Sequence, residues 1–345
     1  MDSLYIENSL IRPAMDDPAS QRAARLIDRF PQADVIPCER YGEVFNPKNQ
    51  DFRAQKSRPA LLVARKFDGR VLPTPVGYGV GGEYNYYFAH MLNCVYDCRY
   101  CFLQGMYRSA NYVLFVNYED YLADIDAKLA QHDVPVWFFS GYDCDSLAFE
   151  PVSGFADYFL PAFAERPQAF LELRTKSTQI RSLLNHPALP NVVVAFSLSP
   201  SPVVAQLEHQ TASLDKRLDA ISRLIQAGWP VGLRFDPIID CEAFESVYSA
   251  FFKQTFDRIE QALTISGRSF TEAVHSISLG TFRLPKPFFK RMVKLYPREP
   301  LFNLSLTEQD SEVSYPDHLN QQRLDFCQQT LARYSPVEKL YTCQL

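Results

Sequence analysis

The sequence predicts an α/β fold: a partial, open (β/α)6 TIM-like barrel with an N-terminal α+β extension and a short C-terminal segment. From about residue 85 to residue 298, six short apolar runs alternate with longer amphipathic runs, a pattern that favours parallel strands joined by helices. Six such units are fewer than the eight of a complete barrel, so we expect the barrel to stay open. Hydrophobic residues make up 47% of the 345 residues, which is enough for a large buried core.

The units of the expected barrel combine a short apolar run with an amphipathic one. The strand candidates are residues 84–89, 134–139, 170–174, 192–198, 231–235 and 276–279. The helix candidates are residues 118–131, 155–164, 215–227, 244–263 and 287–295. In the segment 215–227, Leu218, Ile221 and Leu224 fall on one helical face, and Gly228 follows as a stop signal.

Two further parts flank the barrel, which itself spans residues 85–298. Residues 1–84 form the N-terminal extension, and residues 299–345 form a C-terminal segment that begins with acidic and polar residues. Their expected elements are helices at 20–30 and 321–334, a polar connector at 46–58 and a strand at 60–64.

Composition excludes several classes of protein. The net charge is −5, so any contact with nucleic acid must come from a local basic patch. No apolar run approaches the ~18–20 residues of a membrane span, and residues 1–3 do not begin a secretory signal. We therefore expect a cytoplasmic protein with no membrane partner. Eight cysteines in that compartment favour metal or thiol chemistry over disulfide bonds.

Three of the cysteines form a compact array directly after the first barrel strand: Cys94, Cys98 and Cys101, in a Cys-x3-Cys-x2-Cys pattern. An iron–sulfur cube usually takes four cysteines, so three thiolates leave one iron open for a reacting ligand. This spacing is that of the radical S-adenosylmethionine superfamily. The alternatives are a zinc knuckle completed by His90, since structural zinc takes four ligands, or three buried thiols without a metal.

Segments around this array extend the pattern over most of residues 4–298. They are Tyr5-Ile6-Glu7, Gln55-Lys56, Leu61-Leu62-Val63, Arg65-Lys66, Cys98 to Gln104, Leu214 to Arg217, Ala227 to Pro230, Phe282-Arg283, Lys286-Pro287 and Tyr296-Pro297. On these residues the chain resembles the spore photoproduct lyase family, a branch of DNA-repair enzymes within the radical S-adenosylmethionine superfamily.

The resemblance implies two cofactors and a set of residues that hold them. Cys94, Cys98 and Cys101 would bind a [4Fe–4S] cluster, whose open iron would chelate S-adenosylmethionine. An external donor of the flavodoxin or ferredoxin type would supply the electron. The remaining residues that would bind the cofactor are Ser140 and Gly141 at the methionyl amino group, Lys176 at the carboxylate, and Ser146 and Ser197.

The resemblance also implies two catalytic side chains. Cys144, in the run Cys144-Asp145-Ser146, would donate a hydrogen atom to the substrate radical. Tyr100, directly before the third cluster cysteine, would serve a hydrogen-atom relay. Each side chain also has a purely structural interpretation, as a small core residue or as core packing. The Gly81-Gly82-Glu83 run precedes the cysteines and is interpreted as a turn.

The chain departs from the family pattern in two places. Phe102 follows the third cluster cysteine, where the family usually has tyrosine, and phenylalanine has no O–H for a relay of two phenols. The family's basic and aromatic C-terminal segment has no clear counterpart. In its place stand Glu308, Asp310, Glu312, Tyr315 and Asp317.

One basic segment is a candidate for contacting damaged DNA. Within residues 282–298, cations alternate with aromatic rings, which suits phosphates and bases respectively. Its cations are Arg283, Lys286, Lys290, Arg291, Lys294 and Arg298. The structural alternative is a helix with an apolar inner face and a solvated outer face.

The predicted function is that of a radical S-adenosylmethionine lyase that repairs a thymine-dimer photoproduct. Such an enzyme cleaves its cofactor reductively to methionine and a 5′-deoxyadenosyl radical, which then removes a hydrogen atom from the lesion. One alternative is the same chemistry on RNA or another nucleotide. A second alternative is a non-catalytic binding module stabilised by a metal.

Overall fold

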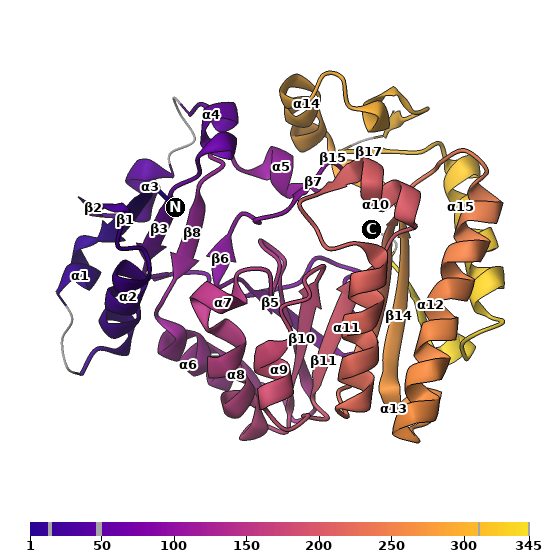
Figure 1. Ribbon diagram of the computed structural model, residues 1–345, viewed down its shortest axis with the longest axis horizontal. Coiled ribbons are helices and arrows are strands. Elements are labelled where there is room, and N and C mark those ends of the chain that lie inside the picture. Colours follow the sequence, from indigo (N-terminus) through magenta and orange to yellow (C-terminus); the bar gives the residue numbers. More distant parts are fainter. Residues whose placement is uncertain (13–15, 46–49, 310, 344–345) are drawn as a thin grey trace.

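The computed structural model describes residues 1–12, 16–45, 50–309 and 311–343. Its centre is an eight-stranded sheet curved into a half-barrel (Figure 1), in the order β18-β14-β13-β11-β10-β9-β5-β4. The six predicted barrel strands are β5 (Tyr84–Phe88), β9 (Val136–Ser140), β10 (Ala169–Thr175), β11 (Val192–Ser197), β13 (Val231–Ile238) and β14 (Val274–Thr281). Neighbours among these six pair in parallel, which confirms the predicted partial barrel.

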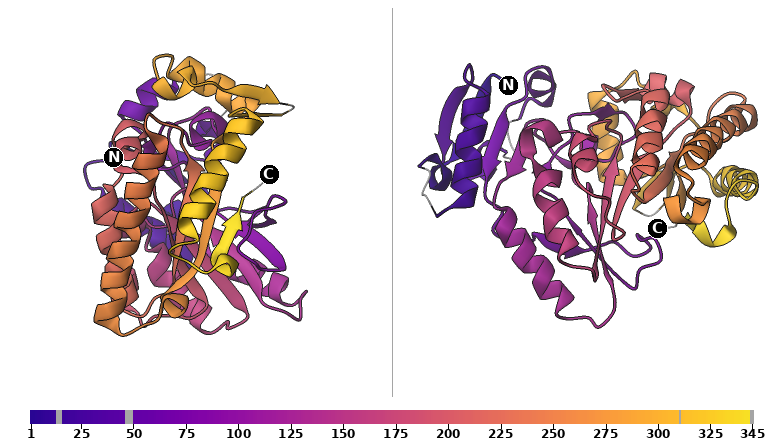
Figure 2. Two further views of the ribbon diagram at one scale, coloured as in Figure 1. Left: turned by 90° about the vertical axis from the view of Figure 1, so that its right-hand side faces the viewer. Right: turned by 60° about the horizontal axis from the view of Figure 1, so that its bottom comes forward.

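The strands carry the apolar content that parallel sheets need when both faces are covered. Every residue of β9 and of β11 is buried. Helices lie along the outer face of the sheet, and the opposite face is concave (Figure 2). The helices between successive strands are α6 (Tyr118–Leu129), α7 (Glu150–Ser153), α8 (Phe155–Ala164), α9 (Arg181–Asn185), α10 (Ser201–Leu207), α11 (Leu214–Gln226), α12 (Phe244–Ser266) and α13 (Phe270–Ala273).

Helix α11 shows how local sequence sets these elements. The side chain of Ser213 accepts a hydrogen bond from the backbone N–H of Lys216 and caps the first turn. Leu218, Ile221 and Leu224 are fully buried. Gly228 follows the helix with φ of 93°, a conformation that glycine adopts without steric cost.

A second sheet lies beside the half-barrel, in the order β2-β1-β3-β8-β6. It combines three strands of the N-terminal extension with two strands that follow β5 in the chain. The predicted helix and strand are present as α2 (Pro18–Arg29) and β3 (Leu61–Ala64). The other elements of the extension are β1 (Ser3–Glu7), α1 (Asn8–Ile11), β2 (Asp34–Cys38), α3 (Tyr41–Val44), α4 (Phe52–Ser57) and β4 (Val71–Pro73), which pairs with β5. Between β5 and α6 lie β6 (Met91–Leu92), β7 (Asp97–Cys98), α5 (Leu103–Met106) and β8 (Tyr112–Phe115). Residues 46–49 of the predicted polar connector lie outside the described residues.

The C-terminal segment contributes to two regions of the fold. Strands β15 (Arg283–Pro285), β16 (Thr307–Gln309) and β17 (Glu312–Ser314) form a small antiparallel sheet near α14 (Lys286–Leu295), above the carboxyl ends of the barrel strands. Helix α15 (Asp317–Leu331) packs against α12 and β14. Strand β18 (Leu340–Thr342) pairs in parallel with β14 and so adds a parallel strand to the six predicted ones. Two 3-10 turns cover Pro300–Asn303 and Val337–Lys339. Asp310 lies outside the described residues.

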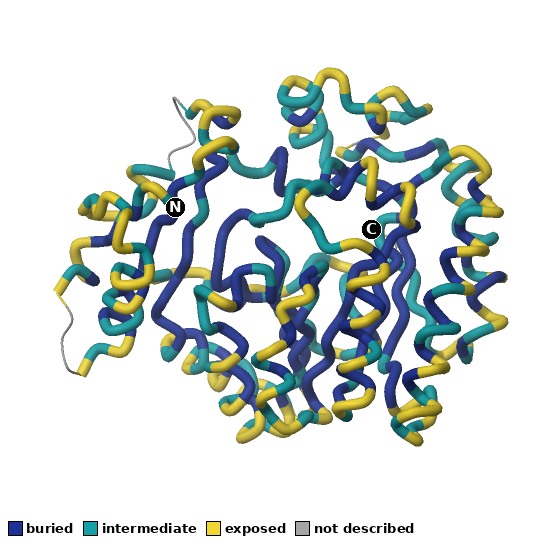
Figure 3. Tube along the Cα trace, in the orientation of Figure 1, coloured by how far each residue is buried: buried dark blue, intermediate teal, exposed yellow. Residues whose placement is uncertain are grey.

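Burial follows this architecture, with buried strands at the centre and exposed helix surfaces outside (Figure 3). Among the described residues, no helix combines the length and the apolar character needed to cross a bilayer.

Candidate active site

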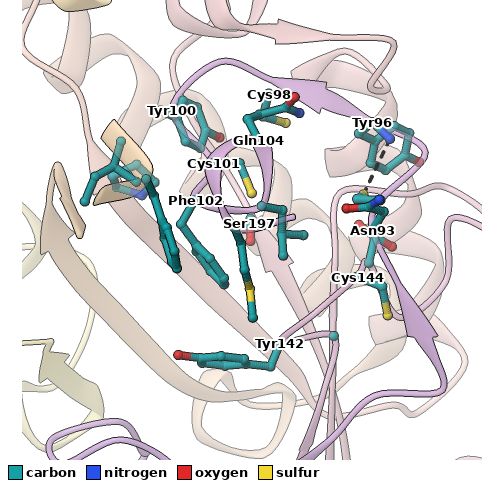
Figure 4. Close-up of a pocket in the computed structure, with 18 of the residues that line it drawn as sticks. Asn93, Tyr96, Cys98, Tyr100, Cys101, Phe102, Gln104, Tyr142, Cys144 and Ser197 are labelled. Atoms are coloured by element: carbon teal, nitrogen blue, oxygen red, sulfur yellow. Dashed lines mark hydrogen bonds between the residues drawn. The ribbon is translucent and has the colours of Figure 1, made fainter. Parts of the chain in front are cut away.

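A cavity of about 530 Å³ opens at the carboxyl ends of the barrel strands, where barrel proteins place reactive groups. The structure brings most of the predicted site residues to its wall: Cys94, Cys98, Tyr100, Cys101, Gly141, Cys144, Lys176 and Ser197. In Figure 4, Cys98 and Cys101 lie at the top and centre of the view, Tyr142 lies below them, and Cys144 lies to the right. Ser140 and Ser146 are buried behind the wall, with their hydroxyl oxygens 3.0 Å apart.

The cysteine loop is anchored to the barrel by backbone hydrogen bonds. Strand β7 pairs antiparallel with β12 (Glu208–His209), which follows α10. The backbone N–H of Arg99 donates to the carbonyl of Leu207 at 2.7 Å. The loop is therefore held by a segment that lies more than 100 positions further along the chain.

A buried polar cluster reinforces this anchor. Tyr100 and Arg217 both donate hydrogen bonds to the carboxylate of Glu208, and all three residues are buried. Arg217 also donates to the carbonyl oxygen of Ser197 at 3.0 Å. Burial acts to raise the pKa of Glu208, but the neighbouring cations Lys176 and Arg217 hold it below its usual value. The cysteine loop is therefore anchored through hydrogen bonds to a charged carboxylate.

The three array cysteines are free thiols in the cavity wall. Burial raises the pKa of each of them, so a bound cation is needed to keep them as thiolates. Among the described residues, no three His, Cys, Asp or Glu side chains converge as ligands of a single metal ion. Thiolates of a [4Fe–4S] cube bind separate iron atoms, so this donor set suits a cluster better than a lone zinc ion.

The zinc interpretation with His90 is wrong. The imidazole of His90 stacks on the ring of Phe155, with centroids 3.9 Å apart, and it does not line the cavity. Both ring nitrogens are buried without a partner among the described residues. Burial lowers the pKa of His90 to about 3, so the ring is a neutral core side chain.

A tight turn connects β9 to the predicted Cys-x-Ser run. Gly141 has φ of 89°, and a Cβ there would lie 2.6 Å from the hydroxyl of Ser146 and 2.9 Å from the carbonyl oxygen of Arg174. Glycine is therefore required, and its backbone is open to the cavity. The binding of the methionyl amino group by the Ser140-Gly141 backbone stays a prediction.

Asp145, which was not predicted as a site residue, organises this turn. Its carboxylate accepts hydrogen bonds from the Thr175 hydroxyl at 2.6 Å and from the Lys176 backbone N–H at 2.6 Å. It also accepts from the backbone N–H of Leu147 at 3.0 Å. Asp145 thereby joins the ends of β9 and β10. Its position between Cys144 and Ser146, just after a predicted strand, was the feature of the sequence that could have indicated a role in the site.

The ammonium of Lys176 lies within the site, 5.4 Å from the centroid of the Tyr100 ring. Burial works to lower its pKa, but Cys98 and Glu208 outweigh that effect, so the pKa is raised. Lys176 is therefore a permanent cation in the cavity wall, as a partner of a cofactor carboxylate must be. Lys176 is therefore not a solvated surface lysine.

Cys144 is as buried as Cys98 and packs in the core beneath the N-terminal sheet. Its exposed fraction is 5%, and burial together with Asp143 raises its pKa well above the usual value. The side chain is thus a neutral thiol. Phe102 packs against Tyr142 with ring centroids 5.5 Å apart, and Tyr142 also contacts Tyr87 at 4.5 Å.

The predicted basic patch does not form one exposed strip. Arg283 lines the cavity and pairs with Asp236 at 3.2 Å, while Lys286 pairs with Glu308 at 2.5 Å. Lys290 and Lys294 are exposed.

Helix α14 instead packs against the cysteine loop. Arg291 donates to the carbonyl oxygen of Met106 at 3.1 Å. A Cβ at Gly105 would collide with the backbone of Phe288, so the helix packs closely on α5. The inner face of α14 is therefore structural.

The fold and the site define a half-barrel protein with a three-thiol loop at the carboxyl ends of its strands. The chain belongs to the spore photoproduct lyase family, because the model described as "Spore photoproduct lyase" matches residues 81–314, more than half of its length.

Individual relatives agree with this assignment. The chain is 27% identical to the spore photoproduct lyase of Bacillus subtilis (strain 168) over 213 residues, which cover 60% of this chain and 59% of that protein. It is 23% identical to the enzyme of Clostridium acetobutylicum over 203 residues, which cover 57% of this chain and 60% of that protein. These matches span about three fifths of the relatives' length.

Solved structures show the same fold. A single-site mutant of spore photoproduct lyase superposes with a TM-score of 0.81 at 18% identity, over 99% of this chain and 98% of that chain. A double mutant with bound AdoMet and dinucleoside spore photoproduct superposes with a TM-score of 0.81 at 17% identity, over 100% and 98%.

Proposed function

We propose that the protein is a radical S-adenosylmethionine lyase that repairs spore photoproduct in DNA. The observation that carries the proposal is the joint placement of the three-thiol loop and the Cys144 thiol on one cavity wall. Family membership supports it, as does the likeness to a structure that holds AdoMet and dinucleoside spore photoproduct.

The residues present fit the two cofactors. When bound, a [4Fe–4S] cluster with S-adenosylmethionine supplies reductive, hydrogen-abstracting chemistry. Cys94, Cys98 and Cys101 would hold the cluster, and their thiols are free to do so. Lys176 would pair with the cofactor's carboxylate as a charge-assisted hydrogen bond. The Gly141 backbone and the Ser197 side chain, both at the cavity wall, would complete the cofactor site, with Ser146 supporting Gly141 from behind.

Cys144 would supply the final hydrogen atom. Its raised pKa keeps the proton on sulfur, and only the S–H form donates a hydrogen atom. In that step the S–H bond breaks, a C–H bond forms on the thymine radical left by fragmentation, and the unpaired electron passes to the sulfur of Cys144. Tyr100 is committed to Glu208, so within this proposal it positions the cysteine loop.

Damaged DNA and an electron donor are the proposed partners. The exposed cations Lys290 and Lys294 lie on α14, which stands above the carboxyl ends of the barrel strands, where they would meet phosphates. A flavodoxin or ferredoxin type protein would deliver the electron. Eight free cysteines suit action in the reducing cytoplasm.

The test uses the anaerobically reconstituted full chain with dithionite and S-adenosylmethionine. We expect bound iron and sulfide with the absorption and EPR signals of a [4Fe–4S] cluster, formation of 5′-deoxyadenosine, and conversion of dinucleoside spore photoproduct to two thymidines. An iron-free protein that retains full activity would contradict the proposal.

The same chemistry on RNA or another nucleotide is a second candidate. It is favoured by Glu312, a carboxylate in the cavity wall, and by Phe102 in place of the family's usual tyrosine. Formation of 5′-deoxyadenosine stimulated by such a substrate, with spore photoproduct left unchanged, would select this candidate.

A further inference from the structure

Part of the cavity wall carries three charged side chains that have no role in the proposed cofactor chemistry. Arg174 stands near the end of β10, Asp236 stands on β13, and Arg283 follows β14, and all three line the cavity. Their side chains are 20%, 13% and 19% exposed. They are therefore largely removed from bulk solvent while remaining accessible from the cavity.

Asp236 and Arg283 form an ion pair that leaves some of their hydrogen-bond donors and acceptors unused. The two terminal nitrogens of Arg283 lie 3.2 and 3.3 Å from the two carboxylate oxygens of Asp236, which are long distances for a charged pair. One of them also donates to the carbonyl oxygen of Thr281 at 2.9 Å. The Nε of Arg283 is buried without a partner among the described residues. A guanidinium has five N–H donors and a carboxylate has about four acceptor positions, so both groups can bind a ligand as well.

The backbone makes room for this pair. A Cβ at Gly280 would lie 2.7 Å from a terminal nitrogen of Arg283 and 2.8 Å from a carboxylate oxygen of Asp236. Any larger residue at Gly280 would push the pair out of place. The close approach is therefore built into β14 and is not an accident of long surface side chains.

Arg174 adds a second oriented cation. Its Nε donates to Glu172 at 3.2 Å, and Glu172 is held in turn by Arg234 at 2.7 Å, with both Glu172 and Arg234 fully buried. The Arg174 guanidinium lies 5.2 Å from the centroid of the Tyr78 ring. Its terminal nitrogens bond no other described residue, so they remain donors to the cavity.

The chemistry of this set selects a neutral, flat ligand. Two positive groups alone would suit a phosphate, but Asp236 and the nearby Glu312 oppose an anion. A carboxylate acceptor flanked by guanidinium donors complements an edge that presents a donor between two acceptors. The aromatic wall of Tyr78, Tyr142 and Phe102 suits a planar base, because every base has a π-face on which aromatic rings stack.

The imide edge of thymine or uracil has this pattern, with N3–H between two ring carbonyls. We infer that Asp236 and Arg283, supported by Arg174, recognise the imide edge of a pyrimidine-2,4-dione ring in the substrate. Asp236 accepts from N3–H, and the guanidinium groups donate to the ring carbonyls. Cytosine presents an unprotonated N3 to the carboxylate instead, and is rejected. This assignment rests on the proposed function for the nucleic-acid character of the substrate.

The test measures ligand recognition separately from repair. Calorimetry on the anaerobic holoenzyme with S-adenosylmethionine compares dinucleoside spore photoproduct and thymidylyl-thymidine with their N3-methylated forms and with the cytosine dinucleotide. We expect the N3-methylated and cytosine ligands to bind at least 10-fold more weakly. This comparison uses the wild-type chain, so it does not depend on the folding of a variant.

A variant then assigns the discrimination to Asp236. Asp236→Asn is expected to weaken binding of the thymine ligand about 10-fold and to lose most of the preference over its N3-methylated form. Asp240→Asn is the matched control, because Asp240 pairs with Arg323 at 2.8 Å, is 23% exposed, and does not line the cavity. The control should keep the wild-type preference.

The outcomes separate this inference from the proposed function. Repair of spore photoproduct without any preference over N3-methylated ligand overturns the inference and leaves the function standing. A strong preference without repair supports the inference and refutes the lesion as substrate. Failure of every pyrimidine-2,4-dione to bind overturns the inference as well.

Discussion

The hydroxyl group of Tyr100 donates a hydrogen bond to the carboxylate of Glu208, a residue more than 100 positions away. Arg217 holds the same carboxylate from the other side, and the Glu208 side chain has no exposed surface. The bond ties the cysteine loop to the barrel. It also removes the phenol of Tyr100 from the set of free groups in the cavity.

Replacing Tyr100 therefore tests the anchor. Tyr100→Phe removes one donor from a buried carboxylate, and a hydrogen bond to a charged group contributes ~1.5–3 kcal/mol. We expect a loss of this order in the free energy of unfolding measured in urea. Tyr334→Phe is the control, because Tyr334 stacks on Phe256 at 4.8 Å and no hydrogen bond joins its hydroxyl to another described residue. Equal stability of the two variants would show that the anchor is energetically unimportant.

The array cysteines are expected to be individually essential for the metal. Cys94→Ala, Cys98→Ala and Cys101→Ala should each lose most of the bound iron and all cleavage of S-adenosylmethionine. Cys327→Ala should keep both, because Cys327 is a buried residue of α15 and does not line the cavity. Iron analysis after anaerobic reconstitution measures the difference. A full iron complement in any of the three array variants would remove that cysteine from the ligand set.

Lys176 is expected to bind cofactor without holding the cluster. Lys176→Ala removes one partner of a charge-assisted bond in a partly dry site, so affinity for S-adenosylmethionine should fall by ~1.5–3 kcal/mol, or about 10- to 150-fold. The iron content should not change. Lys253→Ala serves as the control, since Lys253 forms an exposed pair with Asp257 on α12. An unchanged Kd would place the cofactor carboxylate elsewhere.

Glu150 is expected to make stability depend on pH. Burial raises its pKa from 4.5 to about 7, although the backbone N–H groups of Ala156 and Asp157 oppose the shift. Between those values the folded state holds a proton that the unfolded state has lost, so stability falls as pH rises from 4.5 to 7. The effect is at most ~3 kcal/mol. Glu150→Gln should flatten that decline in urea titrations at several pH values, and an unaltered slope would show that Glu150 ionises normally.

The barrel strands were predictable because their residues are apolar without interruption. Val192 to Phe196 reads as a buried strand from composition alone. Strand β2 was missed because it is mostly exposed and contains Pro37, so it lacks a strand's alternation. The three-residue strand β18 was too short to detect, although it extends the barrel sheet.

The residues of the site also fall into those that the sequence predicts and those that only the tertiary structure reveals. The cysteine array and the Cys144 to Ser146 run are local patterns, and the sequence displays them directly. Glu208 and Asp236 gain their roles from partners far along the chain, Tyr100 and Arg283 respectively. Arg283 illustrates the limit, because its basic neighbours in the sequence suggested a surface patch while tertiary pairing places it in the cavity.

The most direct test of the account is the product formed from dinucleoside spore photoproduct by Cys144→Ala. We expect this variant still to form 5′-deoxyadenosine but to yield trapped or misquenched adducts in mass spectrometry, whereas the wild-type chain yields clean thymidine. Cys241→Ala is the matched control, because Cys241 follows β13 and does not line the cavity, and it should repair as the wild type does. Clean repair by Cys144→Ala together with failure of Cys241→Ala would contradict the assignment of the donor. A wild-type chain that leaves the photoproduct unchanged would contradict the proposed substrate.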